Sequence, residues 1–272
     1  MVEILVNCRI INHLCNQIYY KDKIMALRED FERQGAWLFK WRSYLPVIYL
    51  PMLFFSLKDV KAFERICGDS FGGSWDICSI IISFLGFGLR CATVGYVPRG
   101  TSGRNTKSQV AETLNTTGMY SVVRNPLYLS NFIIIFGITL FIQSLWFALF
   151  TCVIFWLYYE RIMFTEEEFL RKKFGDQFLE WAKITPLIIP RFRNWKKPAL
   201  PFSFKTVLRR EFSTFFSIVA SYFFLELAGN ILIKKKPLVD GSWIAFFLTG
   251  FVLYWTFYIL KKKTKALNVS GR

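Results

Sequence analysis

Two polar segments of this 272-residue chain combine residue types that could hold a charged ligand. The first, TTGMYSVVRNPLYLSNF at residues 116–132, places an arginine, an asparagine and a proline before a long apolar run. Asn125 suits the N-cap position of a helix and Pro126 its first position, so we expect a helix that begins with Leu127. The N–H groups at that helix start favour an anion, and Arg124 adds positive charge. The alternative is an interfacial anchor with a snorkelling arginine.

The second segment, residues 158–190, follows the apolar run and carries three adjacent glutamates at positions 166–168. Adjacent residues fan around a helix axis, so at least one of these carboxylates should face inward. Apolar residues then recur every three or four positions: Leu170, Phe174, Phe178 and Trp181. This spacing predicts an amphipathic helix on a membrane surface, although such a charge run is also typical of a solvated face.

The composition is that of a membrane protein with several spans. The chain is 53% hydrophobic, 19% aromatic and 20% charged, with thirty phenylalanines, and its mean hydropathy is positive. The net charge of +16 could indicate nucleic-acid binding, but the basic residues cluster between apolar runs, as in membrane loops. We therefore expect no nucleic-acid partner.

The apolar runs predict an all-α, polytopic membrane helix bundle with five to six transmembrane helices, about 20 residues each. The expected spans are residues 44–57, 77–98, two within 127–159, 212–233 and 243–260. The run 127–159 is too long for one span and should break at Gln143-Ser144 into a helical hairpin. The first run is short and contains Pro46 and Pro51, so we expect it to be kinked.

The distribution of basic residues predicts that both termini are cytoplasmic. With that orientation, 28 of the 35 Lys and Arg residues lie in cytoplasmic segments and six lie in outer loops. The lysines at 234–236 fit less well, so the last hairpin could be re-entrant. Arg90 lies within a span and should face the bundle interior, with Glu226 and Asn230 as expected structural partners.

Cysteine and histidine usage gives no metal or disulfide framework. The six cysteines form no C-x-x-C pair, and His13 is the single histidine. We expect no metal site. No cleavable signal peptide is evident, and residues 1–24 read unlike the rest, with Met25 resembling a natural start.

Taken together, the two polar segments resemble the isoprenylcysteine carboxyl methyltransferase and phospholipid methyltransferase superfamily of integral membrane enzymes. That family carries Gly-x-Tyr-x-x-x-Arg-His-Pro-x-Tyr, a helical hairpin, Glu-Glu-x-x-Leu-x-x-x-Phe-Gly and a Pro-x-x-x-Pro ending. The matching positions here are Gly118, Tyr120, Arg124, Asn125, Pro126, Tyr128, Glu166, Glu167, Leu170, Phe174, Gly175, Pro186 and Pro190. The resemblance covers about residues 85–190. Asn125 replaces the family histidine and cannot titrate, which puts a proton-transfer role in doubt.

The resemblance implies S-adenosylmethionine as methyl donor and catalytic roles for Arg124 and Glu167. The residues expected to bind the cofactor are Gly118, Tyr120, Arg124, Asn125, Pro126, Tyr128, Glu166 and Glu167. Its carboxylate would suit the helix start and Arg124, and its amino and ribose groups the glutamates. The chain then divides into a cytoplasmic arm (1–43), two spans (44–98), a methyltransferase core (99–190), a basic linker (191–211) and a C-terminal hairpin with a basic tail (212–272).

The expected acceptor is a membrane lipid or a lipidated substrate. The loop upstream of the first motif could cradle a phosphate or carboxylate, although it also fits a plain positive-inside loop. The expected acceptor contacts are Arg90, Arg99, Ser102, Arg104 and Lys107. An anionic oxygen needs no general base, which favours O-methylation of a prenylcysteine carboxylate or a lipid phosphate.

Three alternatives remain open at the level of sequence: a phospholipid N-methyltransferase, an NADPH-dependent oxidoreductase similar to steroid reductases, and a transporter or assembly protein with Arg90 and Glu226 along a path. The expected location is the bacterial inner membrane, or the endoplasmic reticulum in a eukaryote, with the active site facing the cytoplasm. The sequence does not determine the acceptor or the oligomeric state.

Overall fold

The computed structural model describes residues 27–41, 46–57, 60, 66, 68–98, 111–235 and 237–271, and these contain helices but no strand. The helices are α2 (Leu27–Trp41), α3 (Pro46–Ser56), α5 (Asp69–Gly95), α6 (Met119–Val122), α7 (Pro126–Phe141), α8 (Leu145–Phe174), α9 (Asp176–Ile184), the 3-10 turn η2 (Phe192–Asn194), α10 (Phe204–Lys234) and α11 (Gly241–Lys263). The all-α prediction is confirmed.

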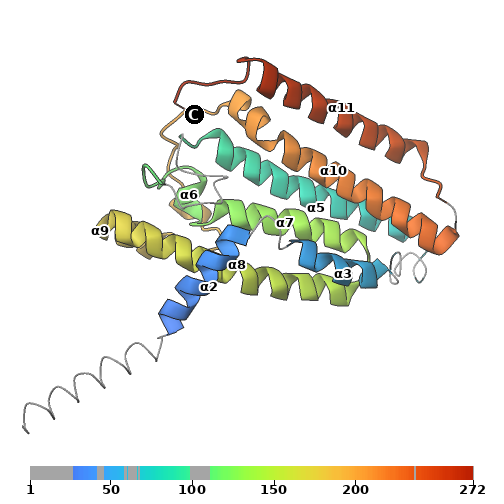
Figure 1. The fold of residues 1–272 in the computed structure, drawn as a ribbon, viewed down its shortest axis with the longest axis horizontal. Helices are drawn as coiled ribbons and strands as arrows, with labels where there is room; N and C mark the ends of the chain where they lie inside the picture. The colour runs from blue at the N-terminus through green and yellow to red at the C-terminus, as the bar shows by residue number, and fades with distance from the viewer. Residues whose placement is uncertain are drawn as a thin grey trace, which may run out of the picture.

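The long helices form a bundle in which α5, α7, α8 and α10 lie side by side, with α11 against α10 (Figure 1). The closest contact is between α5 and α7, where small residues let the backbones approach. A Cβ on Gly86 would lie 2.8 Å from the Ile134 nitrogen, and one on Gly137 would lie 2.4 Å from Ser83 Oγ.

Buried hydroxyl groups tie three of these helices together. Tyr222 of α10 is fully buried, and its hydroxyl donates to the carbonyl of Ser79 on α5 at 2.7 Å. The same hydroxyl lies 2.7 Å from Ser83 Oγ. Phe141 of α7 meets the Tyr222 ring edge to face at 5.1 Å between centroids. Polar groups inside a membrane bundle must find such partners, because no water is available to them.

The hairpin breaks where the sequence predicts. α7 ends at Phe141 and α8 begins at Leu145, so the turn contains Gln143 and Ser144. Gln143 has a φ of 64°, and its side-chain amide donates to Asp76 Oδ1 at 3.3 Å. The left-handed backbone and this polar contact account for the sharp reversal.

Four helices in the described part of the chain are long and apolar enough to cross a membrane: Gly72–Gly95, Leu145–Phe174, Phe204–Leu232 and Gly241–Lys263. Each of the six expected apolar runs is helical, but α7 has 16 residues and α3 has 11, with Pro51 inside it. Both are shorter than the ~20 residues of a full span. The chain is an integral membrane protein, and α3 is the weakest candidate for a crossing.

Several helix boundaries differ from the sequence prediction, because helices continue beyond the apolar part. α5 begins at Asp69 rather than 77, and α10 begins at Phe204 rather than 212. The first two turns of α10 carry Lys205, Arg209 and Arg210. Polar residues at a span end can stay helical in the interfacial region, where water remains available.

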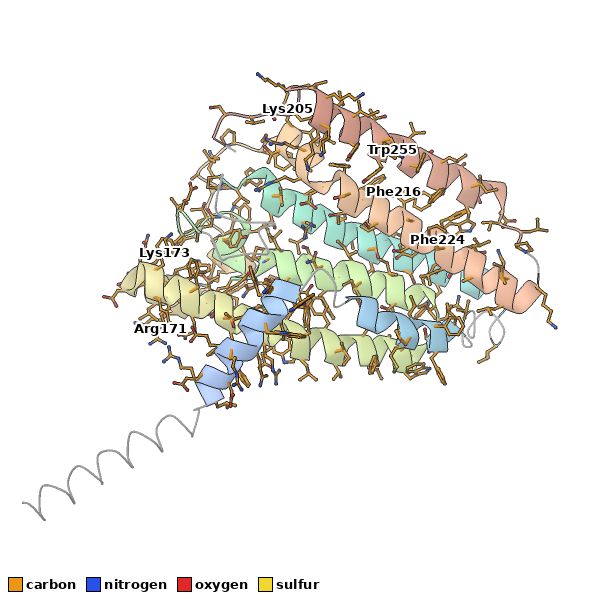
Figure 2. All side chains as sticks on the ribbon, in the orientation of Figure 1. Arg171, Lys173, Lys205, Phe216, Phe224 and Trp255 are labelled. Carbon is orange, nitrogen blue, oxygen red and sulfur yellow. The ribbon has the colours of Figure 1, made fainter. Side chains whose placement is uncertain are left out.

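One end of the bundle collects the polar segments. The last residues of α5, α8 and α11 lie at this end together with α6 and the first residues of α7 and α10 (Figure 1). Arg171, Lys173 and Lys205 lie at the same end, whereas Phe216 and Phe224 lie further along the bundle (Figure 2). Such a basic end is what a cytoplasmic membrane surface favours, although the orientation itself stays a prediction.

Candidate active site

The motif around Gly118 is a turn held against a later loop. Gly118 has a φ of 59°, which glycine adopts at low cost, and its N–H donates to the Lys196 carbonyl at 2.9 Å. A Cβ there would lie 3.2 Å from Pro198 Cγ. The structure thus gives Gly118 a backbone and packing role, and its contact with a cofactor stays a prediction.

Further hydrogen bonds hold the turn that contains Gly118 against the segment that follows α9. The N–H of Arg124 donates to the Pro186 carbonyl at 2.8 Å, and the N–H of Arg191 donates to the Val122 carbonyl at 3.0 Å. Trp181 of α9 donates from its indole N–H to the Tyr120 carbonyl at 2.9 Å. The amphipathic segment therefore positions the first motif, in addition to any contact with a membrane.

The two motifs predicted to cooperate meet across the hairpin. Arg124 Nη1 donates to Glu167 Oε2 at 2.7 Å, with the two side chains 20% and 22% exposed. Tyr128 donates from its hydroxyl to Glu166 Oε1 at 2.9 Å. The start of α7 and the end of α8 thus share two charged or polar pairs between residues far apart in sequence.

The three adjacent glutamates contact different partners. Glu166 and Glu167 face α7, whereas Glu168 is buried against α2, where it forms an ion pair with Arg28. Arg171 lies 3.7 Å from the other oxygen of Glu168. The prediction that at least one carboxylate faces inward is confirmed, because Glu168 is buried between α8 and α2.

Asn125 occupies the predicted N-cap position and Pro126 the predicted first position of α7, so the helix begins one residue before Leu127. Its side chain makes no capping hydrogen bond. The amide instead points toward Glu167 Oε1 and the Leu187 carbonyl, at 3.5 and 3.4 Å. The expectation that this side chain caps the helix is wrong, because the carboxylate and the carbonyl attract the amide donor.

Three buried polar atoms in the site loops have no hydrogen-bond partner among the described residues: Arg124 Nε, Asn115 Nδ2 and Thr185 Oγ1. Thr185 directly precedes Pro186, whose carbonyl binds the Arg124 backbone. Buried polar groups normally have partners, so these atoms are candidate contacts for a polar ligand. Nothing in the sequence singles out Asn115 or Thr185.

Aromatic rings surround the Tyr128–Glu166 pair. The rings of Tyr128 and Tyr159 lie 4.8 Å apart, and Phe155 stacks on Tyr159 at 4.1 Å. Burial, and then the charge of Glu166, raise the pKa of Tyr120, so its phenol stays neutral at physiological pH. Aromatic faces favour cations. Sequence reasoning missed Tyr159, which the hairpin brings beside Tyr128.

Arg90 does not reach its expected partners. It pairs with Glu211 at the start of α10 and donates to Asn131 Oδ1 of α7 at 2.8 Å. Glu226 instead accepts from Asn230 at 3.1 Å. Arg90 lies at the polar end of α5, whereas Glu226 lies about four turns, or ~22 Å, further along α10 than Glu211. Arg90 is therefore engaged in a buried cluster, and any acceptor contact stays a prediction.

The remaining predicted acceptor contacts, Arg99, Ser102, Arg104 and Lys107, lie outside the described residues. Within the described ranges, no group of three or more His, Cys, Asp or Glu residues could hold a metal ion.

Comparison with known proteins identifies the region that contains the two motifs. A family model described as phospholipid methyltransferase matches residues 100–177. Residues 100–177 thus resemble a phospholipid methyltransferase domain. The match includes the Gly118–Tyr128 turn and the glutamates of α8, and it supports a membrane methyltransferase in general. The resemblance predicted from the sequence is confirmed, whereas the roles of individual site residues remain predictions.

Two curated relatives are similar to parts of the chain. Cobalt-zinc-cadmium resistance protein CzcN of Cupriavidus metallidurans is 33% identical over 126 residues, which is 46% of this chain and 55% of the relative. Nickel-cobalt-cadmium resistance protein NccN of Alcaligenes xylosoxydans xylosoxydans is 31% identical over 117 residues, 43% of this chain and 54% of the relative. The chain thus spans about half the length of these relatives. No solved structure matches.

Proposed function

We propose that this chain is an integral membrane enzyme that transfers a methyl group from S-adenosylmethionine to a lipidic acceptor. The observation that carries the proposal is the pair of contacts across the hairpin, Arg124 with Glu167 and Tyr128 with Glu166. These contacts join the two motifs of the family domain at the polar end of the bundle.

The residues present fit the chemistry of the cofactor. The buried Nε of Arg124 and the start of α7, which has no side-chain cap, suit a carboxylate. Glu166 and Glu167 can accept hydrogen bonds from an amino group and ribose hydroxyls. The rings of Tyr128 and Tyr159 suit a sulfonium cation. When bound, S-adenosylmethionine supplies an electrophilic methyl group, and the protein contributes orientation and charge compensation.

The proposed acceptor atom is an anionic oxygen of a lipid-borne phosphate or carboxylate. Such an oxygen already carries the electron pair that forms the new bond, so no general base is needed. This requirement fits the site, because Asn125 stands where the family has a histidine and cannot titrate, and Glu167 is already paired with Arg124. The basic end of the bundle would attract anionic lipids to the site.

Phospholipid N-methylation is a second candidate, because the matching family model is described as phospholipid methyltransferase. An amine acceptor must lose a proton before attack, so its methylation rate should rise with pH up to the amine pKa. The rate of O-methylation of a carboxylate or phosphate should not rise in this way. A pH–rate profile therefore separates the two candidates.

The names of the relatives suggest a physiological setting. Both names refer to resistance to divalent metals. Methylation of an anionic oxygen removes a negative charge, and anionic oxygens are ligands for divalent cations. Lipid methylation would then weaken metal binding at the membrane surface. Growth of a metal-sensitive bacterial host in zinc should improve with the wild-type chain and not with Glu167→Gln.

We also infer that the active site faces the cytoplasm of a bacterial cell, because the cofactor is made there and the polar end is basic.

The central test is direct binding to purified protein in lipid nanodiscs. Calorimetric titration should show binding of S-adenosylhomocysteine and none of NADPH. Tritiated methyl labelling of total membranes should then place label in a lipid fraction. Binding of NADPH without S-adenosylhomocysteine would overturn the proposal in favour of the oxidoreductase alternative.

A further inference from the structure

An apolar groove lies between the end of α5 and the C-terminal hairpin α10–α11, outside the residues that match the family model. Its cavity volume is about 310 Å³, near the lower end of small-molecule sites. Its lining is mainly aromatic and aliphatic and includes Cys91, Phe202, Phe204, Glu211 and Leu253. This volume suits a segment of a hydrocarbon chain rather than a whole lipid.

The lining carries one carboxylate, Glu211, and that charge is already balanced. Glu211 is 2% exposed, forms the ion pair with Arg90 and accepts from the Thr214 hydroxyl at 2.8 Å. The remaining lining residues are aromatic, aliphatic or a half-buried cysteine. A neutral, apolar occupant therefore fits the groove, whereas a free charge or a polar headgroup would lose hydration there.

The groove is connected with the candidate active site through Arg90. The guanidinium bridges Glu211 in the groove wall and Asn131 on α7. Asn131 lies one turn from Tyr128 on α7, and residues three apart on a helix share a face. Tyr128 in turn contacts Glu166. A molecule that spans Arg90 and Tyr128 would thus place its polar end at the site and its apolar end in the groove.

The groove also opens to the side of the bundle. Phe202, Phe204 and Leu253 are exposed, so a chain could enter from the membrane without crossing the core. The rim near Phe202 is fixed, because the Ser203 N–H donates to the Gly95 carbonyl at 2.9 Å and the Phe202 ring covers Gly95. Surrounding lipid tails are as apolar as the groove. Binding in the groove would therefore select the position and shape of the hydrocarbon chain and would add little affinity.

We propose that this groove holds a fatty acyl chain of the phospholipid acceptor and so aligns its headgroup with the site between α7 and α8. The inference rests on the proposed function. It assigns a substrate-binding role to the C-terminal hairpin, which the matched family region does not include.

The test compares two tryptophan substitutions on adjacent residues of α11. Leu253 lines the groove and is 37% exposed, whereas Val252 is 61% exposed and does not line it. Leu253→Trp should fill the groove, and Val252→Trp should only add a ring toward lipid. Both positions tolerate bulk because both are exposed, which keeps folding intact.

The binding readout is photolabelling in nanodiscs by phosphatidic acid with a diazirine at the end of one acyl chain. In the wild type, label should concentrate on groove-lining peptides of α10 and α11. Leu253→Trp should lower that label at least about fivefold, because the indole occupies the cavity, and Val252→Trp should leave it within about twofold. Label spread evenly over the lipid-facing helices, unchanged by Leu253→Trp, would indicate surrounding lipid alone and overturn the inference.

Separate measurements distinguish failure of the groove from failure of the enzyme. Leu253→Trp should bind S-adenosylhomocysteine as the wild type does and should raise KM for the acceptor more than it lowers kcat. Absence of S-adenosylhomocysteine binding in the wild type would overturn the proposed function, whereas the labelling result would still report on the groove. Equal acceptor KM and chain-length profile in the two tryptophan variants would overturn the role in acceptor binding.

Discussion

At the scale of single residues, the candidate site contains the ion pair between Arg124 and Glu167. Each side chain is about one-fifth exposed, so loss of either partner leaves a mostly buried charge without compensation. Arg124 has the further feature of a buried Nε without a hydrogen-bond partner among the described residues. The pair therefore differs from a fully exposed surface ion pair, whose contribution would be small, and its role in ligand binding stays a prediction.

Arg124→Ala should weaken S-adenosylhomocysteine binding at least tenfold, about 1.4 kcal/mol, because the carboxylate of the ligand loses its cation. Isothermal titration measures the affinity. Arg193→Ala is the matched control, because Arg193 is an exposed arginine in the neighbouring turn η2. Equal affinities of the two variants would contradict the role of Arg124.

Asn125→His should retain methyl transfer within about threefold, because imidazole can replace the amide as a donor toward Glu167. A nearby carboxylate stabilises the imidazolium and raises the pKa of the introduced histidine above its usual ~6.5. The ion pair between this imidazolium and Glu167 would then be present at low pH and lost as pH rises through that raised pKa. The rate between pH 5.5 and 8 should acquire this dependence only in the variant; complete inactivation at all pH values would show a specialised role for the asparagine.

At the scale of elements, helix geometry distributes adjacent glutamates to different partners. Successive residues of α8 point in directions about 100° apart, so Glu167 reaches α7 whereas Glu168 reaches α2. The close crossing of α2 and α8 depends on Gly35, where a Cβ would lie 2.1 Å from the Arg161 carbonyl oxygen. Helix α2 thus contacts the end of α8 on a different face from the one that meets Arg124.

Glu168→Gln should therefore differ from Glu167→Gln. The Glu167 variant should lose at least tenfold in S-adenosylhomocysteine affinity, about 1.4 kcal/mol. The Glu168 variant should keep that affinity within twofold and lose thermal stability, because Arg28 and Arg171 lose their partner. Calorimetry and a melting curve in detergent measure the two effects; a reversed pattern would rule out the assignment of the two carboxylates.

Two glycines of α5 offer a matched test of the contact with α7. Gly86→Ala should destabilise the protein by about 1–3 kcal/mol, because its Cβ would overlap the α7 backbone. Gly88→Ala should be neutral or stabilising by up to ~1 kcal/mol, because no atom lies within 4 Å of the added carbon and alanine favours helix. Melting temperatures in one detergent measure the difference, and equal melting temperatures would refute this packing.

At the scale of the whole molecule, successive long helices run in opposite directions, and this arrangement brings the polar motifs to one end of the bundle (Figure 1). The first residues of α7 and α10 and the last residues of α8 and α11 lie at that end (Figure 1). The predicted orientation can be checked in a background without native cysteines. Lys183→Cys on α9 should react with an impermeant maleimide only after permeabilisation of cells, and Asp240→Cys before α11 should react in intact cells. Labelling of both positions from the outside would exclude the predicted topology.

The sequence alone predicted the apolar helices and the two motifs of the candidate site. Hydropathy located the apolar helices, Gln143-Ser144 located the hairpin turn, and the two motifs indicated the family that residues 100–177 match, because these properties depend on residues close together in the chain. The helix starts and the length of α10 were less accurate, since polar turns extend beyond the apolar runs.

Only the tertiary structure decided which polar groups meet. Arg90 pairs with Glu211 rather than Glu226, and Glu168 forms an ion pair with Arg28 of α2. Asn125 faces Glu167 instead of capping its own helix. Asn115 Nδ2 and Thr185 Oγ1 are buried by loop packing, with no hydrogen-bond partner in the part of the chain that the structure describes. Sequence spacing determines where a residue lies along its own helix and on which face. The residue that it contacts on another helix depends on how the separate helices pack side by side.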